Sequence, residues 1–228
     1  MDGPCSYEEL RDCLRDIAKV NRLTFADRPT LDWLARVTER RVSDASGPHS
    51  TLDLGRLRIV DVGCGYGDTL RRIERWAGER GLDVELTGVD LNPAAVRIAR
   101  EATPAGSRIE WIAGDVDSCV AEADLVISSL LTHHLAEEEI VRFLEWMERT
   151  ARVGWFVNDL HRQAAPYYVF RAVAAVARWH PFVRHDGPVS IRRSFVREDW
   201  RRMCAAAGLD AATIAEWRPA RLCVGRVK

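Results

Sequence analysis

A glycine-rich turn between a short apolar strand and an amphipathic helix is the feature that most constrains the fold of this chain. Residues 57–62 predict a buried strand, and residues 69–81 predict a helix. The turn between them carries glycines at positions 63, 65 and 67. Because glycine has no Cβ, backbone N–H groups and the start of the helix can approach a ligand closely. The turn therefore predicts a binding site of the nucleotide type.

The spacing of these glycines distinguishes between kinds of nucleotide site. A dinucleotide-binding turn has the pattern G-x-G-x-x-G, whereas this turn reads G-x-G-x-G. A P-loop is excluded because no Lys-Ser or Lys-Thr pair follows the glycines. Asp61 comes two residues before the first glycine. A carboxylate at that position suits a ligand that carries an ammonium group.

Acidic residues mark the ends of three successive predicted strands. Asp61 lies near the end of the first strand, Asp90 ends a strand at 84–90, and Asp115 follows a strand at 108–113. In open α/β sheets, ligands bind at the carboxyl ends of the strands. Asp90 is placed to accept hydrogen bonds from both hydroxyls of a ribose, and Asp115 to meet an adenine amino group. The three acids together predict one nucleoside site.

The order of the predicted elements indicates an α/β fold. Strands alternate with helices as far as a strand at 152–158, which requires a parallel sheet with right-handed crossovers. The later part predicts a helix at about 196–207 and two strands that form a hairpin. The other elements expected between 57 and 228 are helices at 93–102 and 136–150 and strands at 124–129, 211–217 and 220–227.

Four ordered motifs of the chain resemble those of class I S-adenosylmethionine-dependent methyltransferases. They are DVGCGYG at 61–67, VD at 89–90, GD at 114–115 and DLVISS at 124–129. The resemblance implies a doubly wound, mostly parallel, seven-stranded sheet with one reversed strand. It also implies S-adenosyl-L-methionine as cofactor and S-adenosyl-L-homocysteine as product. The cofactor-binding residues that it implies are Asp61, Gly63, Cys64, Gly65, Gly67, Asp90, Leu91, Asp115, Val116 and Ser129.

Shorter stretches at 20–22, 158–162 and 185–195 are similar to a narrower group within this family. These are bacterial small-molecule methyltransferases related to quinone biosynthesis and often linked with polyketide pathways. The similarity implies a phenolic or quinol-like acceptor, with Asp186, Ser190 and Arg192 at the border of its pocket. A salt-bridged loop is the alternative role for these three residues.

Two segments are expected to cover the carboxyl edge of the sheet. Residues 1–50 predict an N-terminal helical cap over the cofactor, although helices that only pad the sheet would show the same pattern. Residues 51–228 predict the cofactor-binding core. Within it, residues 160–193 form an aromatic-rich insertion before the last helix, which we expect to be a lid over the substrate, with Tyr167 in contact with it. Aromatic residues that fill a small satellite core are the alternative.

The composition of the chain limits its partners and compartment. Its 228 residues suffice for one α/β domain with a small appendage, and the net charge of −1 argues against a dedicated nucleic-acid binder. The six cysteines show no metal-ligand or disulfide spacing, and no apolar segment is long enough to span a membrane. We therefore expect a cytoplasmic protein without a metal site, a nucleic-acid partner or a membrane span. The oligomeric state stays open.

Methylation of a hydroxyl group raises the question of a base, because a phenol has a pKa of about 10 and is mostly protonated at pH 7. Small-molecule methyltransferases often carry a His-Leu pair after the fourth strand. In phosphoethanolamine methyltransferases this histidine belongs to the catalytic pair, and the matching residue here is His134. His161, after the fifth strand, is the second candidate. A purely bracing role for His134 is the alternative.

The main functional hypothesis is O-methylation of a small phenolic or polyketide-type aromatic. C-methylation of a quinol-type precursor and a non-catalytic cofactor-binding partner subunit are the alternatives, and an RNA substrate rests only on the arginines between 192 and 202. Ser128 and Ser129 stand where metal-dependent catechol-type enzymes carry Asp, so Mg²⁺ assistance is not expected. The Asn/Asp-Pro-Pro-aromatic motif of amino-directed nucleic-acid methyltransferases is absent from the sequence.

Overall fold

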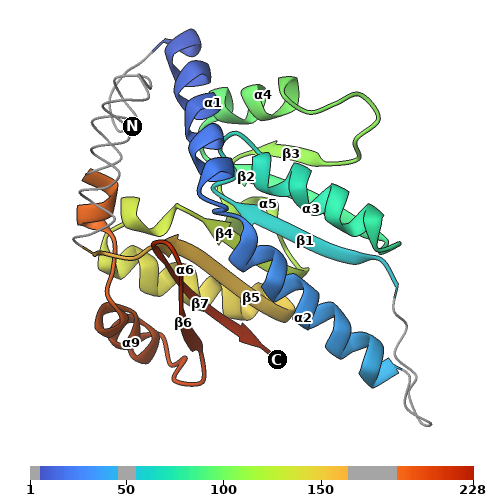
Figure 1. Ribbon diagram of the computed structural model, residues 1–228. Coiled ribbons are helices and arrows are strands. Elements are labelled where there is room, and N and C mark those ends of the chain that lie inside the picture. Colours follow the sequence, from blue (N-terminus) through green and yellow to red (C-terminus); the bar gives the residue numbers. More distant parts are fainter. Residues whose placement is uncertain (1–5, 46–54, 164–188) are drawn as a thin grey trace.

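The computed structural model describes residues 6–45, 55–163 and 189–228 of the chain (Figure 1). One sheet contains seven strands in the order β3-β2-β1-β4-β5-β7-β6. The first five pair in parallel, and β7 runs antiparallel to both of its neighbours, β5 and β6. The expected α/β class, the seven-stranded sheet and its single reversed strand are therefore confirmed. The strands are β1 (Leu57–Val62), β2 (Val84–Asp90), β3 (Glu110–Ala113), β4 (Ala123–Ser129), β5 (Ala151–Leu160), β6 (Thr213–Trp217) and β7 (Arg221–Val227).

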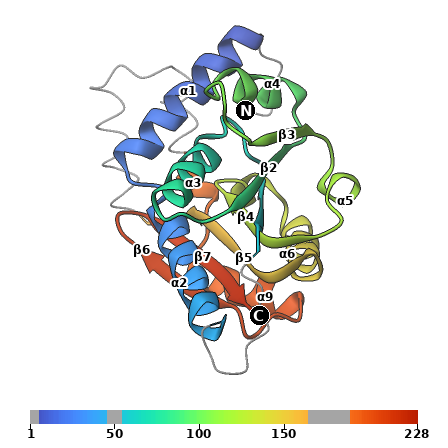
Figure 2. The same ribbon diagram turned by 90° about the vertical axis from the view of Figure 1, so that its right-hand side faces the viewer.

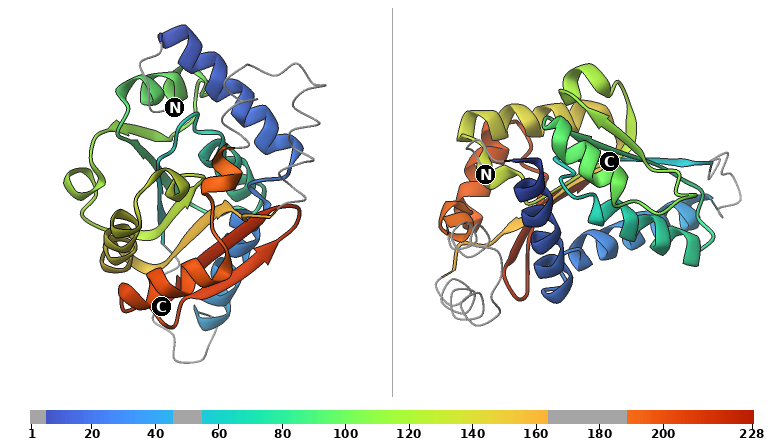
Figure 3. Two further views of the ribbon diagram at one scale, coloured as in Figure 1. Left: turned by 90° about the vertical axis from the view of Figure 1, so that its left-hand side faces the viewer. Right: turned by 90° about the horizontal axis from the view of Figure 1, so that it is seen from above.

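Helices cover both faces of this sheet, so that the protein has three layers (Figure 2). Helices α2, α3 and α4 pack on one face, and α5, α6 and α9 pack on the other. Strand β3 forms one edge of the sheet and the hairpin of β6 and β7 forms the other (Figure 3). The helices are α1 (Tyr7–Leu23), α2 (Arg28–Ala45), α3 (Asp68–Glu79), α4 (Pro93–Glu101), α5 (Val116–Cys119), the 3₁₀ turn η1 (Thr132–His134), α6 (Glu137–Thr150) and α9 (Arg197–Ala206).

The two N-terminal helices have different neighbours. Helix α1 begins at the N-cap Ser6, whose capping box with Glu9 satisfies backbone groups at the helix start. Its buried Leu10 and Leu14 pack against α4, and α1 lies alongside α4 in Figure 1. Helix α2 instead joins the main core, where Trp33 stacks on Phe156 of β5 with ring centroids 5.1 Å apart. Of these two helices, α1 lies outside the main core and α2 belongs to it.

The ends of some elements differ from those that the sequence predicts. Strand β3 begins at Glu110 rather than at 108, because Ser107 and Arg108 both donate hydrogen bonds to the Glu74 side chain of α3 instead of pairing with β2. Strand β5 extends to Leu160 because β7 pairs with it along its whole second half. The one-turn helix α5 was not expected, since four residues show no helical period.

Candidate functional site

The glycine turn between β1 and α3 has the backbone conformation that the sequence predicts. Gly63, Gly65 and Gly67 have φ values of +70°, +51° and +73°, a region that favours glycine. A Cβ on Gly67 would lie 2.2 Å from the ring of Trp111, which comes from β3. The same ring also lies under Gly88 of β2. Trp111 therefore packs directly beneath the turn, and glycine is required at 67 by both conformation and space.

Asp90 connects this turn to the end of β2. One carboxylate oxygen accepts a hydrogen bond from Gly65 N at 2.9 Å, and the other accepts one from Asn92 N, also at 2.9 Å. The backbone adds a third link, because Gly114 N donates to Asp90 O at 3.0 Å and so brings the end of β3 beside β2. The three strand ends that carry the predicted acids thus lie side by side.

Asp61 lies near the end of β1, and one of its carboxylate oxygens lacks a partner. The residue is 2% exposed, and its Oδ1 has no hydrogen-bond partner among the described residues. Burial, followed by repulsion from Asp68 and Asp90, raises its pKa well above the ordinary value. A buried carboxylate in this environment is stabilised by a nearby cation.

These features fit the S-adenosylmethionine that the motifs imply. The unpartnered Asp61 oxygen needs a positive group, which the ammonium of the methionine part carries. Asp115 is exposed and accepts a hydrogen bond from Asp117 N at 3.0 Å, which starts α5. The other predicted cofactor residues lie on the same edge: Cys64 is buried, Val116 and Ser129 are half-buried, and Leu91 is 75% exposed.

A second buried carboxylate, which the sequence did not identify as part of the site, lies at the end of β5. Asp159 is fully buried and accepts hydrogen bonds from the Thr132 hydroxyl, from His133 N at 3.2 Å and from Leu160 N at 2.6 Å. His133 Nδ1 lies 2.7 Å from its Oδ1. Burial tends to raise the pKa of Asp159, but the attraction of His133 and these hydrogen bonds outweigh burial and lower it. Asp159 therefore orients the ring of His133.

The two histidines that the sequence singled out follow the two members of this pair closely in the chain. His134 is exposed at the end of η1, and its ring packs against that of His133 with centroids 4.2 Å apart. His161 is 9% exposed, follows β5, and has its Nδ1 2.8 Å from the Gln163 amide nitrogen. The sequence does not indicate which of the adjacent residues His133 and His134 contacts a carboxylate, because Asp159 is 26 residues away from His133 along the chain.

The predicted acceptor residues are only partly described by the structure. Ser190 and Arg192 lie on a helical segment at 189–193, where Ser190 is half-buried and Arg192 is exposed. Tyr167 and Asp186, with most of the 160–193 insertion, lie outside the described residues. The proposed lid therefore stays a prediction.

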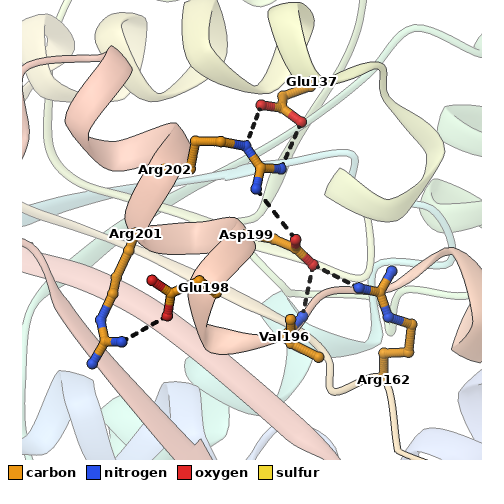
Figure 4. A network of polar contacts seen from close by, with 7 residues as sticks. All are labelled: Glu137, Arg162, Val196, Glu198, Asp199, Arg201 and Arg202. Atoms are coloured by element: carbon orange, nitrogen blue, oxygen red, sulfur yellow. Dashed lines mark hydrogen bonds and ion pairs between the residues drawn. The ribbon is translucent and has the colours of Figure 1, made fainter.

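Arginines near the C-terminal helix form ion pairs with nearby acids (Figure 4). Arg202 of α9 makes a two-pronged contact with Glu137 of α6, with both N–O distances at 2.9 Å. Asp199 accepts from Arg162 at 2.9 Å and lies 3.6 Å from Arg202. These contacts join α9, α6 and the end of β5. The other pairs are Arg201 with Glu198 and Arg197 with Glu216.

Asn158 and Asp159, the pair most suited by type to a metal ion, are engaged within the protein. Asn158 donates to Ala26 O at 2.8 Å and to Thr30 Oγ1 at 3.1 Å, which ties β5 to the turn between α1 and α2. Within the described ranges, no three His, Cys, Asp or Glu side chains are grouped as metal ligands. No helix in those ranges has the length and apolar character needed to cross a bilayer.

Comparison with known proteins agrees with the geometry. Residues 59–154 match a family described as methyltransferase domain. An indolepyruvate C-methyltransferase from Streptomyces griseus is 34% identical over 89 residues, which are 36% of this chain and only 26% of that protein. A ubiquinone biosynthesis O-methyltransferase from Sinorhizobium medicae (strain WSM419) is 28% identical over 183 residues, which are 75% of this chain and 68% of that protein.

Solved structures share the fold at low sequence identity. The plantazolicin methyltransferase BpumL, in complex with S-adenosylhomocysteine and a monoazolic desmethylPZN analogue, has a TM-score of 0.63 and is 14% identical over 96% of this chain and 95% of its own. Magnesium protoporphyrin IX methyltransferase from Synechocystis PCC 6803 with bound S-adenosylhomocysteine has a TM-score of 0.54 and is 15% identical, covering 100% of this chain and 90% of its own. At these sequence identities, the two structures show a similarity in fold alone.

Proposed function

Because the chain belongs to the class I S-adenosylmethionine-dependent methyltransferases, we propose that it methylates a hydroxyl group of a small phenolic or polyketide-type aromatic. S-adenosylmethionine is the methyl donor and S-adenosylhomocysteine the product. The observation that carries the proposal is that one sheet edge contains both an Asp61 oxygen without a partner and the Asp159–His133 pair. The first suits a cationic cofactor, and the second supports a group that handles a proton.

The cofactor half of the edge would bind the donor through residues of β1, β2 and β3. Asp61 would hold the ammonium group, Asp90 the ribose hydroxyls and Asp115 the adenine amino group. When bound, S-adenosylmethionine would supply a methyl group on a sulfonium, and the acceptor oxygen would bond to the methyl carbon as its bond to sulfur breaks, with S-adenosylhomocysteine as the leaving group. The protein contributes by fixing the orientation of the two reactants and by excluding water. We propose α1, which packs beside the glycine turn, as part of the cover, with the 160–193 insertion as its counterpart.

As the new oxygen–carbon bond forms, the hydroxyl group of the substrate must give its proton to a base. We propose His134 for this role, because it is exposed at the edge and its ring rests on His133, which Asp159 holds in place. The proton would pass from His134 to water. His161 is the second candidate, but its Nδ1 accepts from the Gln163 amide, so that the proton of the neutral ring is on Nε2. That tautomer suits a hydrogen-bond donor better than a base.

Binding and turnover test separate parts of this proposal. We expect calorimetry to show micromolar binding of S-adenosylhomocysteine, and absence of binding, or tighter binding of NAD, would contradict it. The change His134→Ala should reduce kcat by about 10²-fold or more on an accepted phenol and leave cofactor affinity intact. Glu138→Ala, an exposed neighbour on α6, is the matched control. Unchanged turnover would assign His134 a bracing role.

The position of methylation needs a separate measurement. The two relatives are named for C-methylation and for O-methylation, so C-methylation of a quinol-type precursor is the second candidate. NMR of the product with a ¹³C-labelled methyl donor would distinguish an O-methyl from a C-methyl resonance. A protein that binds the cofactor but methylates none of a broad phenol panel would favour the third reading, a partner subunit without activity of its own.

We propose a small molecule rather than RNA because the arginines of α9 are paired with acids. Arg201 and Arg202 contact carboxylates in Figure 4, and Arg197 pairs with Glu216, so these charges are already balanced within the protein. Binding to single-stranded RNA that weakens steeply between 50 and 200 mM salt, about in proportion to the phosphates contacted, would overturn this preference.

A further inference from the structure

Arg221, the first residue of β7, is a buried cation that has no direct partner among the described residues. Its side chain belongs to a residue that is 7% exposed, and Nη1 makes no hydrogen bond with any described residue. Its guanidinium also takes part in none of the ion pairs within the described ranges. Buried guanidinium groups are normally paired, because moving an ion out of water is costly. The sequence gave no hint of this residue, which lies far from every motif.

Two of the acids near Arg221 are already engaged elsewhere. Burial lowers the pKa of Arg221, and the attraction of Asp159, then of Cys223, Asp27 and Asp68, opposes this shift. Yet Asp159 is held by the Thr132–His133 segment, and Asp27 is paired with Arg72. These acids lower the cost of burying the guanidinium, but none of them accepts a hydrogen bond from its Nη1.

The position of Arg221 places it on the reactive edge. Strand β7 runs antiparallel to β5, and Leu160 is the register partner of Arg221, so the start of β7 meets the end of β5. His161 N donates to Ala220 O at 3.0 Å, which joins the residue before Arg221 to the second candidate histidine. Asp68, whose attraction raises the pKa of Arg221, begins α3 directly after the glycine turn. Arg221 therefore lies at the same edge of the sheet as the cofactor turn and the histidines, on the strand next to β5.

We propose that Arg221 binds a carboxylate group of the acceptor, which makes the substrate an aromatic acid. This inference rests on the proposed function and narrows its substrate class. The planar fork of a guanidinium matches a carboxylate in a two-pronged contact. A single negative charge would balance the guanidinium of Arg221, whereas a phosphate dianion would be repelled by the surrounding acids. The contact would fix the acceptor at one end and present its hydroxyl to the histidines.

The test uses the whole chain saturated with S-adenosylhomocysteine and three pairs of probes. These are 2-, 3- and 4-hydroxybenzoate, each compared with its methyl ester, which keeps the phenol but removes the charge. Binding is measured by calorimetry and by the shift of the thermal unfolding midpoint. The variants are Arg221→Met, which keeps most of the side-chain volume, and Arg221→Lys, which keeps the charge without the fork. Arg162→Met, at an exposed ion pair beside the same strand end, is the matched control.

At least one acid should bind the wild type more tightly than its ester. Arg221→Met should weaken binding of that acid by about 10- to 100-fold, leave the ester unchanged and leave S-adenosylhomocysteine affinity intact. The affinity of Arg221→Lys for the acid should lie between that of the wild type and that of Arg221→Met. Arg162→Met should bind the acid as tightly as the wild type does. Equal binding of acids and esters, no binding by any of the three acids, or equal losses for acid and ester in Arg221→Met would each overturn the proposal. If the wild type does not bind S-adenosylhomocysteine, the result would instead refute the methyltransferase function itself.

Discussion

Two buried aspartates on the same edge of the sheet have opposite electrostatic environments. Asp61 of β1 has an oxygen without a partner, and burial raises its pKa. Asp159 of β5 is as deeply buried, but hydrogen bonds and His133 lower its pKa. A carboxylate whose partners lie within the protein contributes to stability, whereas one without partners lowers stability until a ligand supplies a cation. The comparison divides the edge into a half prepared for a ligand and a half completed by the fold.

The largest effect should come from breaking the completed half. Asp159→Ala removes the acceptor for Thr132, His133 and Leu160 and leaves Arg221 with less compensating charge. We expect the free energy of unfolding to fall by about 3–5 kcal/mol, measured by chemical denaturation followed by circular dichroism. Glu198→Ala, which removes an exposed ion pair with Arg201, should cost no more than about 0.5 kcal/mol. If Asp159→Ala lowers the free energy of unfolding as little as Glu198→Ala does, the proposed difference between Asp159 and Asp61 would be refuted.

Asp61→Asn should have the opposite effect on stability. The amide keeps the shape of the side chain but removes a buried charge without a partner, so the free energy of unfolding without ligand should rise by about 1–3 kcal/mol. The same change should weaken S-adenosylhomocysteine binding by about 10-fold or more, because the ammonium loses its counter-ion. Denaturation without ligand and calorimetry with it measure the two effects. A variant that is both less stable and fully able to bind would show that Asp61 has a structural role.

The pH dependence of stability should distinguish the two aspartates. The raised pKa of Asp61 means that its contribution to stability is highest below the ordinary value of 3.8 and is lost as the pH rises through its folded pKa. The lowered pKa of Asp159 gives a contribution that is complete above 3.8 and is lost as the pH falls through its folded pKa. The stability gain of Asp61→Asn should therefore grow as the pH rises above 4. The stability loss of Asp159→Ala should shrink below that pH.

A smaller effect is expected at Asp90. Its carboxylate accepts from Gly65 N and Asn92 N, so Asp90→Ala should loosen the turn as well as remove the proposed ribose contacts. We expect cofactor affinity to fall by about 2–3 kcal/mol in binding free energy, from hydrogen bonds of about 1–2 kcal/mol each. Asp83→Ala, at the opposite end of β2 and 62% exposed, should leave affinity unchanged. Calorimetry with S-adenosylhomocysteine compares the two directly.

The cofactor half could be predicted from the sequence because its parts are contiguous. The turn, its glycines and the acids at strand ends each follow a strand within a few residues, and parallel pairing then brings Asp61, Asp90 and Asp115 to one edge. The reversed strand followed from the predicted final hairpin and from the resemblance. These features depend on local pattern and on a general rule of topology.

The other half could not be predicted, because its contacts join distant residues. His133 and Asp159 are brought together by the pairing of β4 with β5, and Arg221 joins them only through the register of β5 with β7. Nothing in the sequence of His133 and His134 distinguishes the buried ring from the exposed one. The separate packing of α1 and α2 was also open, since both helices show similar apolar spacing.

The ring of Trp111, wedged beneath Gly67 and Gly88, has a consequence for how this protein can diversify. The positive φ of Gly67 keeps glycine at that position, but positions 88 and 111 share one fixed space, so a larger residue at 88 is tolerated only with a smaller residue at 111. We expect related sequences to vary these positions as a set, and a designer who wishes to reshape the cofactor turn should begin by shrinking the indole on β3.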